Sequence, residues 1–503
     1  MTAPSRALPG RLTDEWALLI LAALLLLGYG AELVSTALVA DEAYWGDLRR
    51  AELLRETLAG GRWGSALAVA ILPTVVEPAV HQGLGLAMMT AALWWVARGR
   101  LAIGVAPALV VTAVAITLPW LALNVAFGLN ALFLGFGFLA VAAACRLIDG
   151  HSWRSLAGAV GCIALAYGCY EPMALAAIAA VGGLVAARRP HRIIRAATSL
   201  GAGIALSLVV SWLARAVSGI PENPYVADVA AGLDPDRGVG SVAAALGRTV
   251  RKTGLTGAIY GQTVPWLAIL AVTGTVFALW WVWRARDRWI GLAALAAVLA
   301  VPFLAELVAD VPYRSMVYLP WVCLSTAGLA LPALRRAWGG RPSPRWLAVG
   351  VAALAVASNL TLVSNTLASA QVTAERDRYL ALRIDEEWRR ITQSVGAPEA
   401  RPVVTLAGQG WPESSWYPSR ELIGLSTYPI AQHFGAASLR GMGVPALTPT
   451  KAQVERGTAL LQTMPSYPQP GWVSIQEGLL LVRIDSCQAV GSASCLAPVT
   501  TRR

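Results

Sequence analysis

Two acidic side chains, Asp41 and Glu42, follow the first long apolar segment of the chain, within the run Val39 to Asp47. A carboxylate at a membrane boundary can accept the proton of an acceptor hydroxyl while a sugar is transferred to it. It can also hold a divalent cation that neutralises a departing phosphate. Asp41 and Glu42 are therefore the predicted catalytic pair, and the candidate ligands if the protein uses a metal. The alternative interpretation is a solvated acidic loop after a span.

A candidate partner for a phosphate is Arg314, in the run Asp310-Val311-Pro312-Tyr313-Arg314 before a later apolar segment. A guanidinium there can bind a lipid phosphate through paired, charge-assisted hydrogen bonds and favour it as a leaving group. The alternative is an interfacial arginine whose head reaches for water. Weaker candidates for the same role are Arg215, Arg248, Arg251 and Lys252.

A third candidate is Glu171, in the short connection Tyr170-Glu171-Pro172 between two apolar segments. A glutamate in so apolar a connection is costly unless it is hydrated or paired. We therefore expect Glu171 to contact sugar hydroxyls or Arg314. A tight, water-exposed turn containing proline is the alternative.

Other constellations are missing from the sequence. It has no glycine-rich phosphate-binding motif with a lysine and no cysteine pair with metal spacing, and its four histidines are scattered. A histidine-ligated metal is not expected. An activated lipid is therefore the more natural energy source than a nucleotide, and no cofactor is predicted beyond a possible divalent cation at Asp41 and Glu42.

The elements that must position these residues are apolar. Hydrophobic residues make up 56% of the 503 residues and charged residues only 14%, which is typical of a polytopic membrane protein. About eleven segments approach the roughly 20 residues that cross a bilayer. They are Trp16–Val39, Pro78–Ala97, Leu101–Leu121, Ala126–Cys145, Leu156–Tyr170, Pro172–Ala187, Ala196–Val217, Val264–Trp283, Trp289–Val308, Ser315–Leu334 and Trp346–Leu367.

Every second short loop between these segments is basic, which predicts their orientation, because Lys and Arg in short loops stay on the cytoplasmic side. The pattern places the N-terminus in the cytoplasm and the C-terminus outside the cell membrane or in the periplasm. The net charge of +11 is thus explained by topology, and no nucleic-acid partner is predicted.

The domain organisation follows from the fall in hydropathy near Leu367. Residues 1–367 form a predicted multi-span α-helical domain with exterior loops at about 40–77 and 218–263. The first loop has apolar residues at helical spacing between Leu48 and Leu58, which predicts a helix on the membrane surface. Residues 368–503 form a predicted small exterior α/β domain.

Within that C-terminal region, the apolar pattern from Val372 to Ile391 predicts a long amphipathic helix, and Val403–Leu406 a strand. A hairpin is predicted over Trp472–Ile475 and Leu479–Ile484. Two cysteines near the C-terminus, Cys487 and Cys495, predict a disulfide in an oxidising compartment, with two free thiols as the alternative.

The chain resembles the GT-C class of polyprenyl-phosphate-dependent glycosyltransferases, and within it the serotype-converting O-antigen glucosyltransferases of the Gtr type II family. The resemblance rests on Asp41-Glu42, Arg49-Arg50, Gly61-Arg62-Trp63, Tyr170-Glu171-Pro172 and Pro312-Tyr313-Arg314. It covers most of the membrane region but not the C-terminal tail. The family more often has paired aspartates and Tyr-Gln-Pro where this chain has Asp-Glu and Tyr-Glu-Pro, which leaves the sugar and the acceptor open.

The resemblance implies a membrane-embedded hexosyltransferase. It would move a hexose, typically glucose, from a polyprenyl-phosphate carrier to a cell-surface glycan or glycolipid on the outer face of the membrane. The implied substrate-binding residues are Arg314, Glu171, Tyr170, Arg49 and Arg50, beside the catalytic Asp41 and Glu42.

Two other classes of function remain open. A transporter or flippase of lipid-linked saccharides would need ionisable residues deep within several spans. Most charges lie at the ends of the predicted spans, and Glu32 and Glu306 are the nearest exceptions. A non-catalytic component of envelope polysaccharide assembly is the third possibility. Consumption of a lipid-phosphate sugar would separate an enzyme from both.

Overall fold

The computed structural model describes most of the chain in seventeen stretches of sequence. They are residues 12–33, 50–72, 78–101, 103–188, 192–221, 238–256, 258–259, 262–263, 265–285, 288–308, 315–337, 343–395, 401–407, 436, 439–440, 444–467 and 469–484. These residues divide into two compact units. The boundary falls within one long helix, between Ser364 and Asn365, and residues 50–53 and Gln262 group with the second unit.

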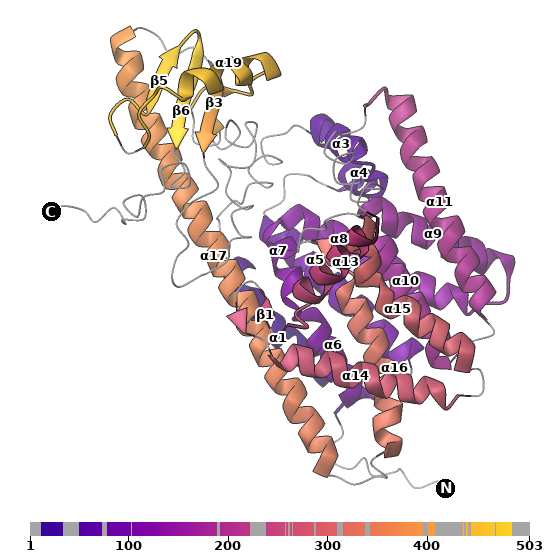
Figure 1. Cartoon of the computed structure of the whole chain (residues 1–503). Coiled ribbons are helices and arrows are strands. Elements are labelled where there is room, and N and C mark those ends of the chain that lie inside the picture. The colour runs from indigo at the N-terminus through magenta and orange to yellow at the C-terminus, as the bar shows by residue number, and fades with distance from the viewer. Residues whose placement is uncertain are drawn as a thin grey trace, which may run out of the picture. The chain divides into compact units, whose positions relative to one another are not determined.

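Helices dominate the structure (Figure 1). The α-helices are α1 (Asp14–Leu33), α3 (Arg50–Ala59), α4 (Trp63–Ile71), α5 (Pro78–Trp95), α6 (Val105–Ile116), α7 (Ala122–Ala126), α8 (Gly128–Ile148), α9 (Trp153–Cys169), α10 (Met173–Arg188), α11 (Ile193–Ser218), α13 (Gly238–Lys252), α14 (Pro265–Trp283), α15 (Arg288–Val308), α16 (Leu319–Ala337), α17 (Ser343–Val395) and α19 (Lys451–Leu461). A π-helix, η1 (Val96–Arg100), and a 3-10 helix, η2 (Pro119–Leu121), join neighbouring α-helices.

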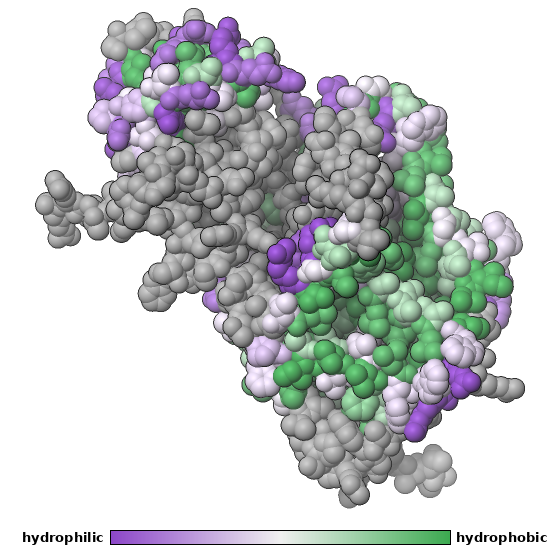
Figure 2. Space-filling view, in the orientation of Figure 1, coloured by the Kyte–Doolittle hydropathy of each residue, from purple (hydrophilic) through white to green (hydrophobic). Residues whose placement is uncertain are grey.

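Six helices in the described residues are long and apolar enough to cross a membrane. They are Asp14–Leu33, Gly128–Ile148, Ile193–Ser218, Pro265–Trp283, Arg288–Leu307 and the Val349–Gln393 part of α17. A seventh is obtained if Val105–Ile116 and Pro119–Ala126, bent by 50° at their junction, form one span. Apolar side chains also cover much of the visible face of the bundle over α10, α11, α14 and α15 (Figure 2).

The number of spans that meet these criteria is smaller than the eleven predicted. The four other predicted spans coincide with α5, α9, α10 and α16. Helices α9 and α10 have only 17 and 16 residues. At about 1.5 Å per residue each is shorter than the roughly 30 Å of a bilayer's hydrocarbon core. The predicted third span is broken because Pro119 forces Leu118 out of the helical conformation (ψ 131°).

Close contacts show how α10 runs relative to its neighbours α15 and α16. Gly182 of α10 lies against Val298 of α15, and Ala186 lies against Gly291, so α10 and α15 are antiparallel. Ser325 of α16 donates a hydrogen bond to the Ala179 carbonyl of α10 at 2.9 Å. Together with a contact between Tyr170 and Ser315 at the starts of the two helices, this makes α10 and α16 parallel.

The second unit contains a four-stranded mixed sheet of order β4-β3-β6-β5. Its strands are β4 (Ala446–Leu447), β3 (Arg401–Ala407), β6 (Leu479–Ile484) and β5 (Val473–Gln476). Strand β3 is parallel to both neighbours, whereas β5 and β6 form an antiparallel hairpin. The hairpin turns at Glu477 and Gly478, both with positive φ (51° and 77°), which confirms the predicted hairpin.

Helices cover both faces of this sheet. On one face, Ile384 and Trp388 of α17 pack against Val403 and Val482. On the other, Leu461 of α19 packs against strands β3 and β6. A capping box between Thr450 and Gln453 begins α19, a helix that was not predicted from the sequence.

The long helix α17 differs from the prediction. A span ending at Leu367 and a separate helix from Val372 were expected, but one helix continues from Ser343 to Val395. The residues between the two predicted elements, Ala368-Ser369-Ala370-Gln371, contain neither glycine nor proline, so nothing in their side chains interrupts the helix. Two short strands, β1 (Ala258–Ile259) and β2 (Gln262–Thr263), form a separate two-stranded sheet.

Candidate functional site

An ion pair joins two of the short connections between helices. The Arg62 Nε lies 3.2 Å and 3.3 Å from the two carboxylate oxygens of Glu171, and the two side chains are 27% and 32% exposed. The Arg62 guanidinium also lies over the Tyr170 ring, 4.9 Å from its centroid. The Tyr170 hydroxyl is 2.9 Å from the Ser315 hydroxyl. We call Arg62, Tyr170, Glu171 and Ser315 the Arg62 cluster.

Tyr170 and Glu171 lie in the short connection between α9 and α10, and the backbone of this connection sets their positions. Helix α9 ends at Cys169 because Tyr170 is extended (φ −162°, ψ 125°). Pro172 disfavours a helical conformation at Glu171 and suits the first turn of α10. The carboxylate of Glu171 therefore stands at a break between two helices instead of facing the apolar flank of either one.

The position of Arg62 is fixed from both sides. Gly61, with φ 76°, makes the turn that ends α3, and its carbonyl accepts a hydrogen bond from Ser211 of α11 at 2.7 Å. The Trp63 indole donates to the Ser207 hydroxyl at 2.8 Å. Ser65 donates to the Cys169 carbonyl at 2.6 Å, which ties α4 to the end of α9.

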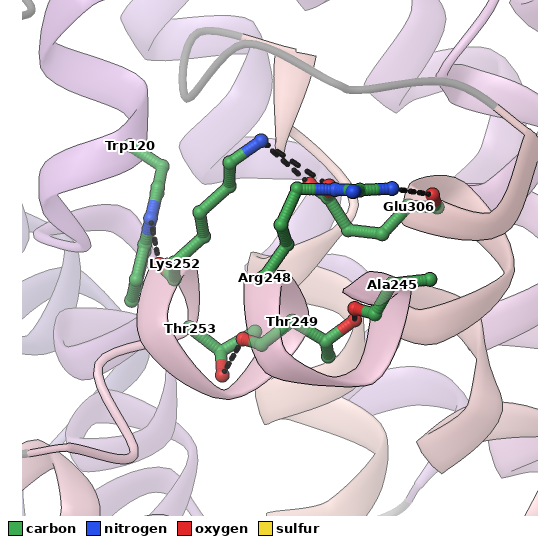
Figure 3. A network of polar contacts seen from close by, with 7 residues as sticks. All are labelled: Trp120, Ala245, Arg248, Thr249, Lys252, Thr253 and Glu306. Carbon is green, nitrogen blue, oxygen red and sulfur yellow. Dashed lines mark hydrogen bonds and ion pairs between the residues drawn. The ribbon is translucent and has the colours of Figure 1, made fainter. Parts of the chain in front are cut away.

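A second polar network is buried between α13 and α15 (Figure 3). The Glu306 carboxylate is fully buried and accepts from Lys252 Nζ at 3.0 Å and 3.2 Å, and from Arg248 Nε at 3.0 Å. A second Arg248 nitrogen donates to the Glu306 carbonyl at 2.9 Å. The Trp120 indole donates to the Lys252 carbonyl at 3.0 Å. This network clamps α13 to the bundle.

Helix α13 is amphipathic, but its charged face is directed inward. Arg248 and Lys252, spaced four residues apart, share the face that meets Glu306. Val242 and Leu246 are 46% and 55% exposed on the other side. An outward apolar face suits a helix in contact with lipid at the edge of a membrane.

Both networks lie toward the same end of the bundle. Because α10 and α15 are antiparallel, the start of α10 beside Glu171 is level with the end of α15, where Glu306 lies. The opposite end carries arginines stacked on tryptophans, including Arg284 on Trp280 (4.2 Å) and Arg146 on Trp95 (6.0 Å). Arginine and tryptophan together are typical of a membrane interface.

The predicted site residues are only partly within the described structure. Glu171 and Tyr170 are brought together with Arg62, for which no separate role was predicted from the sequence. Arg50 is exposed at the start of α3. Asp41, Glu42, Arg49 and Arg314 lie outside the described residues, as do Cys487 and Cys495.

Two of the weaker candidates for binding phosphate form ion pairs with a glutamate of the protein itself. Arg248 and Lys252 pair with Glu306, which the sequence analysis noted only as an unusually deep charge. The sequence does indicate that these residues need partners. An arginine and a lysine four residues apart lie on one helical face, and a buried glutamate needs opposite charges.

A metal centre has no counterpart in the described residues: nowhere among them do three or more His, Cys, Asp or Glu side chains gather as a cation site would require. The cysteines of the described helices, Cys145, Cys162, Cys169 and Cys323, are free and lie in buried or half-buried positions.

The fold and these networks define a multi-pass helical membrane protein whose C-terminal residues form a small mixed-sheet unit. Comparisons with protein-family models, with curated proteins and with solved structures found no match.

Proposed function

We propose that the protein is a membrane hexosyltransferase that uses a polyprenyl-phosphate hexose as donor. It transfers the hexose, with glucose the first candidate, to a cell-surface glycan or glycolipid on the outer face of the membrane. The observation that carries the proposal is the Arg62 cluster. It is a partly exposed ion pair with a stacked tyrosine, at the bundle end opposite the Arg–Trp contacts. Such a cluster offers charged and aromatic groups to a sugar phosphate at membrane level.

The proposed reaction inverts the anomeric centre. The acceptor hydroxyl oxygen bonds to the anomeric carbon, and the bond from that carbon to the phosphate oxygen breaks. Asp41 takes the hydroxyl proton, assisted by Glu42, and polyprenyl phosphate leaves with the bonding electrons. If a divalent cation takes part, these two carboxylates hold it against the leaving phosphate.

The remaining residues bind the donor. Arg314 pairs with the phosphate, and Arg49 and Arg50 add positive charge on its approach. Glu171 orients the sugar through its hydroxyls while Arg62 holds the carboxylate in place. Ser315, the neighbour of Arg314 in the sequence, contacts Tyr170, which supports a common site for these residues.

The proposed membrane topology has eleven spans, with α5, α9, α10 and α16 added to the six long helices and the bent α6–α7 pair. The N-terminus is then cytoplasmic, and the Arg62 cluster and the C-terminal unit are on the outer side. The basic loops and the Arg–Trp contacts at the other end support this orientation.

The test is transfer by the purified full chain in lipid nanodiscs. The protein is incubated with radiolabelled polyprenyl-phosphate hexoses and envelope glycans, and label in the glycan is counted for wild type and Asp41→Asn. Transfer by the wild type that is lost in the correctly folded variant is the expected result. Equal transfer by both proteins would remove Asp41 from the site.

One observation favours a second candidate, a transporter of lipid-linked saccharides. Glu306 is fully buried with two cationic partners, and Glu32 is 2% exposed near the end of α1. Buried ionisable groups within spans often mark translocation pathways. Movement of an intact donor across the membrane, without its consumption, would favour this candidate.

A further inference from the structure

A cluster of basic and hydroxyl side chains joins the start of α9 to the start of α11, two helices that lie side by side (Figure 1). Arg195 donates to the Ser152 carbonyl at 2.7 Å and to the Ser155 hydroxyl at 2.5 Å. Arg192 lies 2.8 Å from Nε2 of His151. We call His151, Ser152, Ser155, Arg192 and Arg195 the α9–α11 basic cluster.

The two arginines have hydrogen-bonding capacity to spare. Among the described residues, the Nε atoms of Arg192 and Arg195 are buried without a hydrogen-bond partner. Neither guanidinium forms an ion pair within that part of the chain. Two guanidinium charges that no carboxylate of the described residues offsets attract an anion, which can accept from their N–H groups.

The cluster also surrounds the N-terminal end of a 17-residue helix. Ser152 caps α9 and accepts a hydrogen bond from the Ser155 backbone. The first backbone N–H groups of a helix and its dipole favour negative charge. The arginines and the helix end therefore attract an anion to the same place.

The neighbouring side chains place this anion site at a lipid surface. Trp153, the first residue of α9, is 73% exposed, and Ile194, between the two arginines, is 78% exposed. Exposed tryptophan beside arginine is typical of the boundary between lipid headgroups and hydrocarbon. A site for a soluble anion has no need of a large apolar rim.

We propose that the α9–α11 basic cluster binds the phosphate of an anionic phospholipid in the leaflet at this end of the bundle. The phosphate oxygens accept from guanidinium N–H groups of Arg192 and Arg195 and from the α9 N-terminus. Trp153 and Ile194 contact the glycerol and acyl region. This lipid site goes beyond the proposed transferase activity and does not depend on it.

The experiment titrates the purified full chain in detergent with phosphatidylglycerol or phosphatidylcholine and counts bound lipids by native mass spectrometry. The double variant Arg192→Gln/Arg195→Gln is compared with Arg284→Gln/Arg288→Gln, which removes two arginines from Arg–Trp contacts at the same end. We expect the first pair to weaken phosphatidylglycerol binding at least about tenfold and the second by less than about twofold.

A second variant keeps the proposal testable if the double variant does not fold. Ser155→Glu places a carboxylate beside Arg195 at the third helical position, where glutamate favours a helix capped by serine. The variant should fold as well as wild type by size-exclusion chromatography and lose phosphatidylglycerol binding to the same extent.

The proposal would be overturned by equal loss in both double variants, by phosphatidylcholine binding as tightly as phosphatidylglycerol, or by undiminished binding in Ser155→Glu. Displacement of the lipid by millimolar inorganic phosphate would likewise assign the cluster to a soluble anion.

Discussion

Arg62 is held by the carboxylate of Glu171 on one side and by the ring of Tyr170 on another. An ion pair that is partly exposed adds little to the stability of a fold, because water reaches and screens both charges. Its effect is therefore expected in the positioning of the two side chains and not in the free energy of unfolding.

Replacing Glu171 with Gln should impair transfer while leaving the fold intact. The amide keeps the shape but loses the charge that holds Arg62, so kcat/KM for the donor should fall at least about tenfold. Radiolabel transfer measures this loss. Glu56→Gln on α3 is the control and should keep wild-type activity. Wild-type activity in Glu171→Gln would exclude the Arg62 cluster from the site.

Glu306→Gln should strongly destabilise the membrane unit. The change removes the carboxylate charge that faces Lys252 and Arg248 in the network of Figure 3, and breaking a buried ion pair costs about 3–5 kcal/mol. Thermal unfolding monitored by fluorescence measures the shift. Glu386→Gln, in an exposed pair with Arg383 on α17, is the control and should leave the midpoint unchanged. Equal midpoints for the two variants would contradict the structural role of Glu306.

At the scale of elements, the contact between α4 and α9 decides where Arg62 lies. Gly168 of α9 meets the Trp63 ring so closely that an added methyl group would overlap it. An added methyl group at Gly64 would also overlap the Cys169 backbone. Two glycines thus allow the short helix α4 to rest directly on the end of α9, next to Glu171.

Gly168→Ala should therefore displace α4 and reduce transfer. The methyl group forces Trp63 away, with an overpacking cost of about 1–3 kcal/mol, and Arg62 moves with its neighbour. Activity and the unfolding midpoint should both fall. The matched control is Gly161→Ala in the same helix, where nothing lies within 4 Å of the added carbon. If both variants behave alike, the close packing of α4 does not position the cluster.

Much of the element pattern could be predicted from the sequence because apolar length and periodicity are local signals. Each predicted span overlaps an α-helix, although the third is broken at Leu118, and the predicted hairpin coincides with β5 and β6. The lengths of the helices were harder to predict from the sequence. The shortness of α9 and α10 and the continuity of α17 depend on where capping residues and prolines fall.

Individual residues of the candidate site could be predicted from the sequence, but their pairings could not. Glu171 was found because a charge between apolar segments is unusual, but its partner Arg62 is 109 positions away, and no local pattern joins them. The pairing of Glu306 with Lys252 required the same long-range packing of α13 against α15. Pairings across the sequence come from tertiary structure, which periodicity does not encode.

At the scale of the whole molecule, orientation in the membrane is the property on which the outer-face chemistry depends. In a chain with Cys487 and Cys495 replaced by serine, Arg50→Cys and Arg154→Cys each add one accessible thiol. A membrane-impermeant maleimide should label Arg50→Cys in intact cells, and Arg154→Cys only after permeabilisation. Labelling of Arg154→Cys in intact cells would reverse the topology and place the Arg62 cluster in the cytoplasm.

The central claim is that the donor is consumed. The most direct measurement is the stoichiometry of products in sealed liposomes that contain the protein, a radiolabelled polyprenyl-phosphate hexose and an acceptor glycan. The account predicts one polyprenyl phosphate released for each hexose that appears in the glycan, and no release without acceptor. Intact donor crossing the bilayer, with no polyprenyl phosphate formed, would contradict the transferase and leave transport as the function.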